Sequence, residues 1–174
     1  MSREKPTPTG RESPLGDDEL IVTKTDTHGR LTYANEVFLR VSHLDGKGVL
    51  GQPHSIIRHP DMPRCVFELL WKTISAGEEF FGYVLNLATN GDHYWVFAHV
   101  TPSRAADGTI TGYHSNRRKP EPRHVAAISA IYRDLAAAER AEADRKAGQR
   151  RGGEELASLL HARNSTYERF VFSI

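Results

Sequence analysis

The chain has a single cysteine, Cys65, among its 174 residues, so no disulfide can form within it. No stretch approaches the roughly 18–20 consecutive apolar residues of a membrane-spanning helix, and the opening residues lack the apolar core of a signal peptide. The formal net charge is only +1, and cutting the chain after Lys119 leaves both parts nearly neutral. Such a balance gives no field that favours nucleic acid or an anionic membrane. These absences predict a cytoplasmic protein that binds no nucleic acid and has no membrane span.

Motifs of common enzymes and metal sites are also missing. The chain has no G-x-S-x-G elbow, no P-loop and no Rossmann glycine pattern, and its one cysteine lacks a local catalytic signature. None of the nine histidines belongs to an H-x₃-H pattern, and there is no C-x₂-C pair. His93 and His99 share a face of one predicted strand but would lie about 20 Å apart, too far to share a metal. We therefore expect a protein that is not an enzyme and holds no metal.

Length and composition divide the chain into three parts. Its 174 residues suit one domain with extensions. Residues 1–16 are rich in proline, serine and charge, which predicts a disordered N-terminal arm without a fold of its own. Pro120 and Pro122 end the central domain. The predicted organisation is an arm at 1–16, a domain at 17–119, and a helical extension or linker at 120–174.

Five strand-like runs predict an antiparallel sheet in the central domain. Two of them frame a turn and form a hairpin, and the other three follow one another with strong turn signals at Asn90-Gly91 and Asp107-Gly108. Predicted helices are grouped between these two sets, so the sequence predicts an α+β fold whose sheet carries helices on one face. The runs are Leu20–Thr25, Arg30–Ala34, FFGYVLNLA, HYWVFAHVTP and TITGYHSNRR.

The helices are predicted from capping residues and apolar spacing. Asn35 can cap a short helix, and an amphipathic helix of about three turns follows Pro63 and stops near Gly77. In the extension, an apolar stripe at helical spacing fades where it meets Glu139. The pair Gly152-Gly153 is expected to interrupt the extension before one more short helix and an apolar end.

The segment GQPHSIIRHPDMPRC, residues 51–65, has neither helical nor strand periodicity. Its three prolines fix the backbone dihedral φ and remove backbone donors, so the path is irregular and stiff. A stiff path that carries Arg58, His59 and Asp61 suits holding polar side chains around a ligand. The alternative is an ordinary surface loop.

Three segments together resemble the PAS domain of bacterial aerotaxis receptors, from about Asp17 to Arg118. They are TDTHGRLTYANEVFLRVS, GQPHSIIRHPDMPRCVFELLW and NGDHYWVFAHVTPSRAADGTITGYHSNRRKP. The resemblance implies a PAS fold and a sensor that holds FAD non-covalently and reports redox or oxygen status through a flavin-dependent conformational change. We also expect a homodimer through the PAS domain and terminal helices, and a signalling partner protein.

The resemblance implies a set of cofactor-binding residues. The family's flavin-binding positions fall on six residues of this chain, and two tryptophans match aromatic positions of the same motifs. One strand departs from the family: LNLATNG, with Leu85 and Leu87, stands where basic residues are expected, and Phe80 stands where a tryptophan is expected. The lost charges could weaken a pyrophosphate or partner contact. The implied binding residues are Asn35, Arg58, His59, Asp61, Phe67, Asn86, Trp71 and Trp95.

Each of these residues also has a structural interpretation. Asn35 suits a helix cap as well as a ligand, and Asp61 suits orienting Arg58 or His59, or capping the next helix. The aromatic residues suit the core as well as the walls of a cofactor site. Asn86 lies among apolar strand neighbours, where a buried carboxamide needs hydrogen-bond partners that a ligand edge would supply.

Two other functions remain open from the sequence. A haem-binding PAS gas sensor would need an axial histidine, and a cofactor-free PAS module would only dimerise or dock a partner. A cysteine–flavin adduct is not expected, because PRCVFEL does not reproduce the motif of light-oxygen-voltage domains; Cys65 is expected to pack as a small hydrophobe. The candidate axial ligands are His54, His59, His93, His99 and His114.

Overall fold

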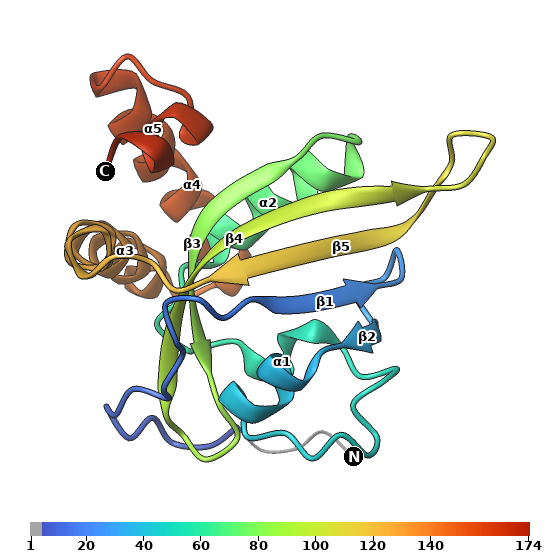
Figure 1. Cartoon of the computed structure of the whole chain (residues 1–174). Coiled ribbons are helices and arrows are strands. Elements are labelled where there is room, and N and C mark those ends of the chain that lie inside the picture. Colours follow the sequence, from blue (N-terminus) through green and yellow to red (C-terminus); the bar gives the residue numbers. More distant parts are fainter. Residues whose placement is uncertain (1–4) are drawn as a thin grey trace.

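A computed structural model describes residues 5–174, and its centre is one antiparallel sheet of five strands (Figure 1). The strand order is β2-β1-β5-β4-β3, so the two ends of the central domain meet where β1 pairs with β5. This arrangement confirms the predicted α+β fold. The strands are β1 (Ile21–Thr25), β2 (Leu31–Ala34), β3 (Phe80–Leu87), β4 (His93–Arg104) and β5 (Ile110–Arg118).

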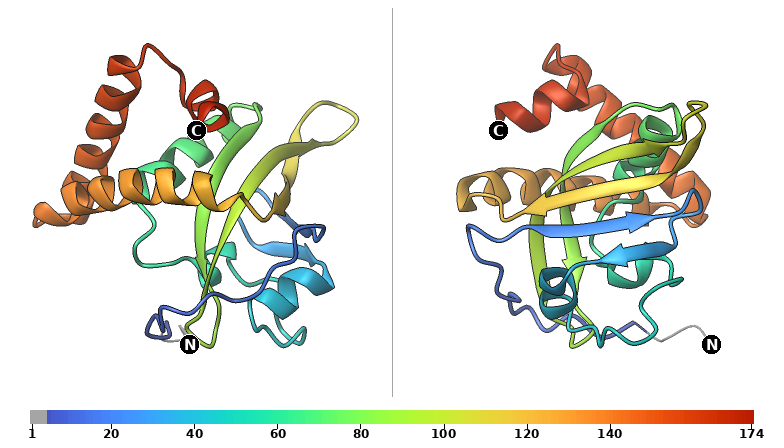
Figure 2. Two further views of the ribbon diagram at one scale, coloured as in Figure 1. Left: turned by 60° about the vertical axis from the view of Figure 1, so that its left-hand side comes forward. Right: turned by 45° about the vertical axis from the view of Figure 1, so that its right-hand side comes forward.

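Three helices of the central domain cover one face of the sheet. Three more form the C-terminal extension beside β3 (Figure 2). No helix within residues 5–174 combines the length and the apolar character needed to cross a bilayer. The helices are α1 (Glu36–Val41), the 3₁₀ helix η1 (His54–Ile57), α2 (Arg64–Ser75), α3 (Pro122–Ala141), α4 (Arg145–Ala162) and α5 (Tyr167–Ser173).

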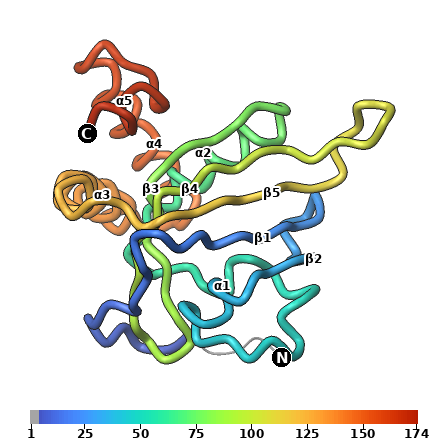
Figure 3. The backbone as a smooth tube through the Cα atoms, in the orientation of Figure 1, coloured from blue at the N-terminus to red at the C-terminus, as the bar shows by residue number. Residues whose placement is uncertain are grey.

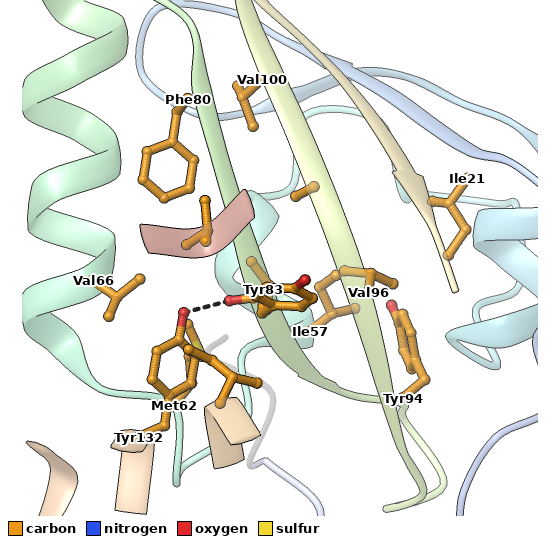
Figure 4. Packing of buried hydrophobic residues seen from close by; sticks show 14 of the residues in the cluster. Ile21, Ile57, Met62, Val66, Phe80, Tyr83, Tyr94, Val96, Val100 and Tyr132 are labelled. Atoms are coloured by element: carbon orange, nitrogen blue, oxygen red, sulfur yellow. Dashed lines mark hydrogen bonds between the residues drawn. The ribbon is translucent and has the colours of Figure 1, made fainter. Parts of the chain in front are cut away.

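The alternation of β4 separates the two faces of the sheet. Tyr94, Val96 and Ala98 are buried, while the residues between them are only partly buried. Successive side chains of a strand point to opposite faces, so the buried set faces α1, η1 and α2. This set forms the hydrophobic core with Phe38 of α1 and Val66 of α2. Figure 4 shows Tyr94, Val96 and Val66 in this core. We call the helix-covered side the inner face.

The N-terminal arm is held against the β3–β4 hairpin (Figure 3). Thr9 N–H donates to the Gly91 carbonyl at 2.8 Å, and Ser13 N–H donates to the His93 carbonyl at 2.7 Å. The Ser13 hydroxyl is buried and donates to the carbonyl of Val41. The backbone of the arm thus finds hydrogen-bond partners in the β3–β4 hairpin. The disordered arm expected from the composition stays a prediction, and residues 1–4 lie outside the described part.

The extension packs on the edge of the sheet at β3. The Tyr132 hydroxyl of α3 donates to the Tyr83 carbonyl of β3 at 2.8 Å, as the dashed line in Figure 4 shows. Tyr167 of α5 stacks on Phe80 with ring centroids 5.5 Å apart. Backbone groups and aromatic faces at the β3 edge are therefore covered by the protein's own helices.

The pair Gly152-Gly153 does not interrupt the extension, contrary to the prediction. Helix α4 runs through both glycines, because a helix can carry glycine where a neighbour comes too close for a side chain. A Cβ atom at Gly152 would lie 2.7 Å from the side chain of Glu139 and 3.2 Å from the sulfur of Cys65. Glu139 is itself buried, not the solvated end of an apolar stripe.

Candidate functional site

A cavity of about 270 Å³ lies between the inner face of the sheet and the helices η1 and α2. Strands β1, β3, β4 and β5 each contribute alternate residues to it, as expected from their two-residue period. We call it the sheet cavity. Its lining includes Thr23, Thr25, His54, Ile57, Arg58, Arg64, Phe67, Glu68, Leu70, Trp71, Ile74, Val84, Asn86, Ala98, Val100, Tyr113, Ser115, Arg117 and Gln149.

Unpartnered polar atoms converge on the sheet cavity. Within residues 5–174, four buried side-chain nitrogens have no hydrogen-bond partner: Nη2 of Arg58, Nδ2 of Asn86, and Nε and Nη1 of Arg117. All three residues line the sheet cavity. A buried donor without a partner costs about 1–3 kcal/mol, so native proteins seldom leave several in one place. Three residues of the cavity wall therefore carry buried donors without partners.

Arg58 and Asn86 are neighbours in the wall of the sheet cavity. Their backbones form an isolated antiparallel bridge, which fixes the segment from Gly51 to Cys65 against β3. The Arg58 guanidinium lies over the ring of Phe67, 4.2 Å from its centroid. Burial lowers the pKa of Arg58, and repulsion from Arg145 adds to this shift. Three of the implied binding residues, Arg58, Phe67 and Asn86, thus share this cavity.

Two cavity residues, Arg117 and His54, were not among the implied binding residues. Arg117 of β5 is buried, donates to the Thr23 hydroxyl and lies 5.4 Å from the Phe38 ring centroid. Burial lowers the pKa of Arg117 to about 10. The two-residue period of TITGYHSNRR places Arg117 on the same face as Tyr113, and this signal could have identified it.

His54 lies beside Arg117 in the cavity wall. Its Nε2 is 3.3 Å from the Thr23 hydroxyl oxygen. Burial lowers the pKa of His54 to about 3, and repulsion from Arg117 contributes. Of the five histidines considered as haem ligands, only His54 lines the sheet cavity.

Trp71 forms a partly exposed section of the cavity wall. Its side chain is 39% exposed and meets Tyr113 edge-on, with ring centroids 5.6 Å apart. On its other side it contacts Gly29, which has a φ of +75° and where a Cβ atom would come within 2.9 Å of the indole. The β1–β2 turn thus holds this tryptophan beside the cavity.

Four of the implied residues do not line the sheet cavity. Asn35 caps α1: its Oδ1 accepts from Phe38 N–H and Val22 N–H, and its Nδ2 donates to the Leu20 carbonyl. Trp95 lies on the opposite face of the sheet, where its ring is 6.0 Å from that of Tyr132. These contacts match the structural interpretation of both residues.

His59 and Asp61 follow Arg58 in the stiff segment. His59 is buried, its Nδ1 accepts from Asp61 N–H, and burial lowers its pKa. It lines a second cavity, which also receives Arg58. The exposed carboxylate of Asp61 pairs with Arg140 of α3 at 2.5 Å.

The departures from the family pattern lie away from both cavities. Leu87 and Ala88 are almost fully buried, and neither they nor Leu85 line a cavity. Cys65 does not line the sheet cavity either; burial raises the pKa of its thiol to about 12, and the neighbouring Glu139 carboxylate adds to the shift. Nor does any cluster of three or more metal-binding side chains occur within residues 5–174.

The fold and this site define the chain as a member of the PAS family, since residues 21–115 match the family described as PAS fold. The aerotaxis receptor of Escherichia coli (strain K12) is 39% identical over 127 residues, which cover 73% of this chain and 25% of the receptor. The nitrogen fixation regulatory protein of Klebsiella pneumoniae is 26% identical over 99 residues, 57% of this chain and 20% of that protein. The chain spans about a quarter of the aerotaxis receptor.

Solved structures show the same fold. The light state of the blue-light photoreceptor Aureochrome1 LOV superposes with a TM-score of 0.58 and 18% identity, covering 63% of this chain and 88% of that one. A light-oxygen-voltage domain studied with a flavin analogue gives a TM-score of 0.59 over 67% of this chain and 88% of that one, also at 18% identity. At these identities the likeness concerns the fold, which matches the predicted PAS architecture.

The lowered pKa of His54 predicts a pH dependence of stability. The unfolded chain binds a proton near pH 6.5 and the folded chain only near pH 3, so stability falls as pH falls between these values. We expect His54→Gln to reduce the slope of the unfolding free energy against pH by about 1 kcal/mol per pH unit between pH 6 and 4. Urea unfolding at several pH values measures this slope. Equal slopes in the wild type and in His54→Gln would refute a proton-linked role for His54.

Proposed function

We propose that this PAS domain binds FAD non-covalently with the flavin ring in the sheet cavity, and that it reports redox or oxygen status. The observation that carries the proposal is the convergence of unpartnered nitrogens of Arg58, Asn86 and Arg117 on one cavity. The 39% identity to a protein named as an aerotaxis receptor supports the same function.

The residues present fit a flavin ring. A flavin supplies reversible electron and proton uptake, and its ring needs apolar walls, hydrogen-bond donors for its polar edge, and a cation near a ring that becomes anionic on reduction. Ile57, Ile74 and Val84 supply apolar walls. The unpartnered amide of Asn86 on β3 is a donor that the polar edge of the ring would satisfy, and the guanidinium of Arg117 keeps its positive charge at neutral pH.

The cavity size indicates how much of the cofactor it encloses. Its volume of about 270 Å³ is close to the lower end of the roughly 300–1,000 Å³ typical of ligand pockets. A planar ring system suits this volume, whereas a complete dinucleotide does not. We therefore propose that the ring enters the sheet cavity and that the rest of FAD extends beyond it.

The extension contacts the cavity wall, which gives a route for the signal. Gln149 of α4 donates to Glu68 of α2 at 2.8 Å, and both line the sheet cavity. Glu139 of α3 accepts from the backbone N–H groups of Arg64 and Cys65, the first two residues of α2. Reorganisation of Arg58 and Asn86 around a ring that becomes anionic on reduction would shift α2, and these contacts would pass the shift to α3 and α4.

The remaining expectations form part of the same proposal. We propose a cytoplasmic signalling domain without turnover, a homodimer through the PAS domain and terminal helices, and a partner protein that reads the extension. Phe172 of α5 is an apolar side chain 58% exposed, and it suits such a contact. The oligomeric state is measured directly by light scattering on the purified chain.

The first experiment is the absorption spectrum of the purified protein before and after reconstitution with FAD. We expect flavin bands that survive gel filtration, and reversible bleaching with dithionite and air. Acid precipitation should release the flavin, because the binding is non-covalent. A protein that stays colourless after reconstitution would contradict the proposal. A Soret band would instead favour haem, with His54 as the histidine in the sheet cavity.

A further inference from the structure

A second cavity, of about 210 Å³, lies at the junction of the arm, the stiff segment, α2 and the extension. We call it the basic cavity. It adjoins the sheet cavity, because Arg58 and Arg64 line both. Its lining is Lys5, Arg58, His59, Pro60, Met62, Arg64, Ala136, Glu139, Arg140 and Arg145.

Most cations of the basic cavity lack a counter-ion within residues 5–174. Arg140 pairs with Asp61, but no ion pair forms at Lys5, Arg58, Arg64 or Arg145. Among the described residues, the Lys5 ammonium donates to the Arg58 carbonyl, at 2.8 Å. Cations gathered from three separate parts of the chain thus face one small space.

The one carboxylate that lines the basic cavity is already engaged. The two oxygens of Glu139 accept from Arg64 N–H at 3.0 Å and Cys65 N–H at 2.8 Å. Its negative charge offsets one cation, and the net charge of the lining stays positive. Burial lowers the pKa of Lys5, and repulsion from Arg58 and Arg145 lowers it further, which indicates that the cations are not neutralised.

We propose that the basic cavity is a binding site for a phosphate or diphosphate group, formed jointly by the PAS domain and its extension. Guanidinium groups match phosphate oxygens with paired hydrogen bonds, and an anion here would relieve the repulsion among the cations. A water molecule occupies about 30 Å³ in the liquid. The basic cavity, at about 210 Å³, has several times that volume, so it has room for one diphosphate group.

Two kinds of molecule carry such a phosphate or diphosphate group. One is the diphosphate of FAD, whose ring would fill the adjoining sheet cavity; this assignment rests on the proposed function. The other is a free phosphate-bearing anion.

Calorimetric titration of the flavin-free full chain with sodium pyrophosphate tests the site. We expect saturable binding that Arg145→Gln weakens about tenfold, the effect of one lost charge-assisted hydrogen bond. Arg150→Gln removes the same charge from an exposed position of the same helix and should change the affinity less than twofold. Both side chains are exposed, so neither change removes a core contact; Lys5→Gln on the arm provides an independent variant with the same expected loss.

Absent pyrophosphate binding in the wild type, or equal weakening by Arg145→Gln and Arg150→Gln, would overturn the proposal. Parallel titrations with FAD and riboflavin identify which molecule supplies the anion. If the anion is the cofactor's diphosphate, bound FAD blocks pyrophosphate, and Arg145→Gln weakens FAD but not riboflavin. If it is a free anion, the FAD-loaded protein still binds pyrophosphate. A protein that binds pyrophosphate but no flavin would refute the proposed function and leave the anion site standing.

Discussion

Replacing Asn86 with leucine is expected to stabilise the flavin-free protein by about 1 kcal/mol or more and to lower its FAD content at least tenfold. The Nδ2 atom of Asn86 is buried without a partner, so the free protein gains when the amide is replaced by an apolar side chain of similar size. In the Asn86→Leu variant, a bound flavin ring would lack the Nδ2 donor of Asn86. Urea unfolding of the flavin-free protein and absorbance after reconstitution measure the two effects.

A matched control distinguishes this from a purely structural asparagine. Asn35→Ala removes the three hydrogen bonds that cap α1 and tie it to β1, so it should cost about 1–2 kcal/mol of stability. Its FAD content should match the wild type, because Asn35 does not line the sheet cavity. If Asn86→Leu loses stability and keeps its FAD, the ligand role of Asn86 is wrong.

Glu139→Ala is expected to destabilise the protein by about 2 kcal/mol or more. Pro63 offers no side-chain cap to α2, and the buried carboxylate of Glu139 accepts from the first two N–H groups of that helix. Glu139→Gln keeps one acceptor oxygen and should lose about half as much. Urea unfolding measures the loss. Glu142 is exposed and lies three residues after Glu139, so the stability of Glu142→Ala should stay within about 0.5 kcal/mol of that of the wild type.

The variant Glu139→Gln also tests the proposed route of the signal from the sheet cavity to the extension. In the wild type, limited proteolysis after Arg140 or Arg145 should differ between the oxidised and reduced protein if the signal passes through α2. Glu139→Gln should reduce that difference while leaving the absorption spectrum unchanged. An undiminished difference would show that the signal leaves the cavity without Glu139.

Much of the fold could be predicted from local patterns. The alternation in HYWVFAHVTP placed Tyr94, Val96 and Ala98 on one face, and the structure buries all three. Asn35 suited a cap and forms one. Such features depend on residues close in sequence, because capping and two-residue periodicity are local properties.

The candidate site was predicted only in part. Arg58, Phe67, Trp71 and Asn86 line the sheet cavity, whereas Asn35, His59, Asp61 and Trp95 do not. Arg117 was missed, although the period of its strand points it inward. A motif identifies which residues belong to a segment, but the direction of each side chain depends on how that segment meets the sheet.

The sequence by itself determined the sheet, its turns, the capped helices and a stiff polar segment beside them. Its single cysteine excluded an intrachain disulfide, and its near-neutral charge and missing catalytic motifs argued against a nucleic-acid-binding protein and against common classes of enzyme. Only the tertiary structure decided that Arg58 and Arg117 share a cavity, that the arm reaches the β3–β4 hairpin, and that Glu139 caps α2. These contacts join residues far apart in the chain, and they form only because packing of the core brings their elements together.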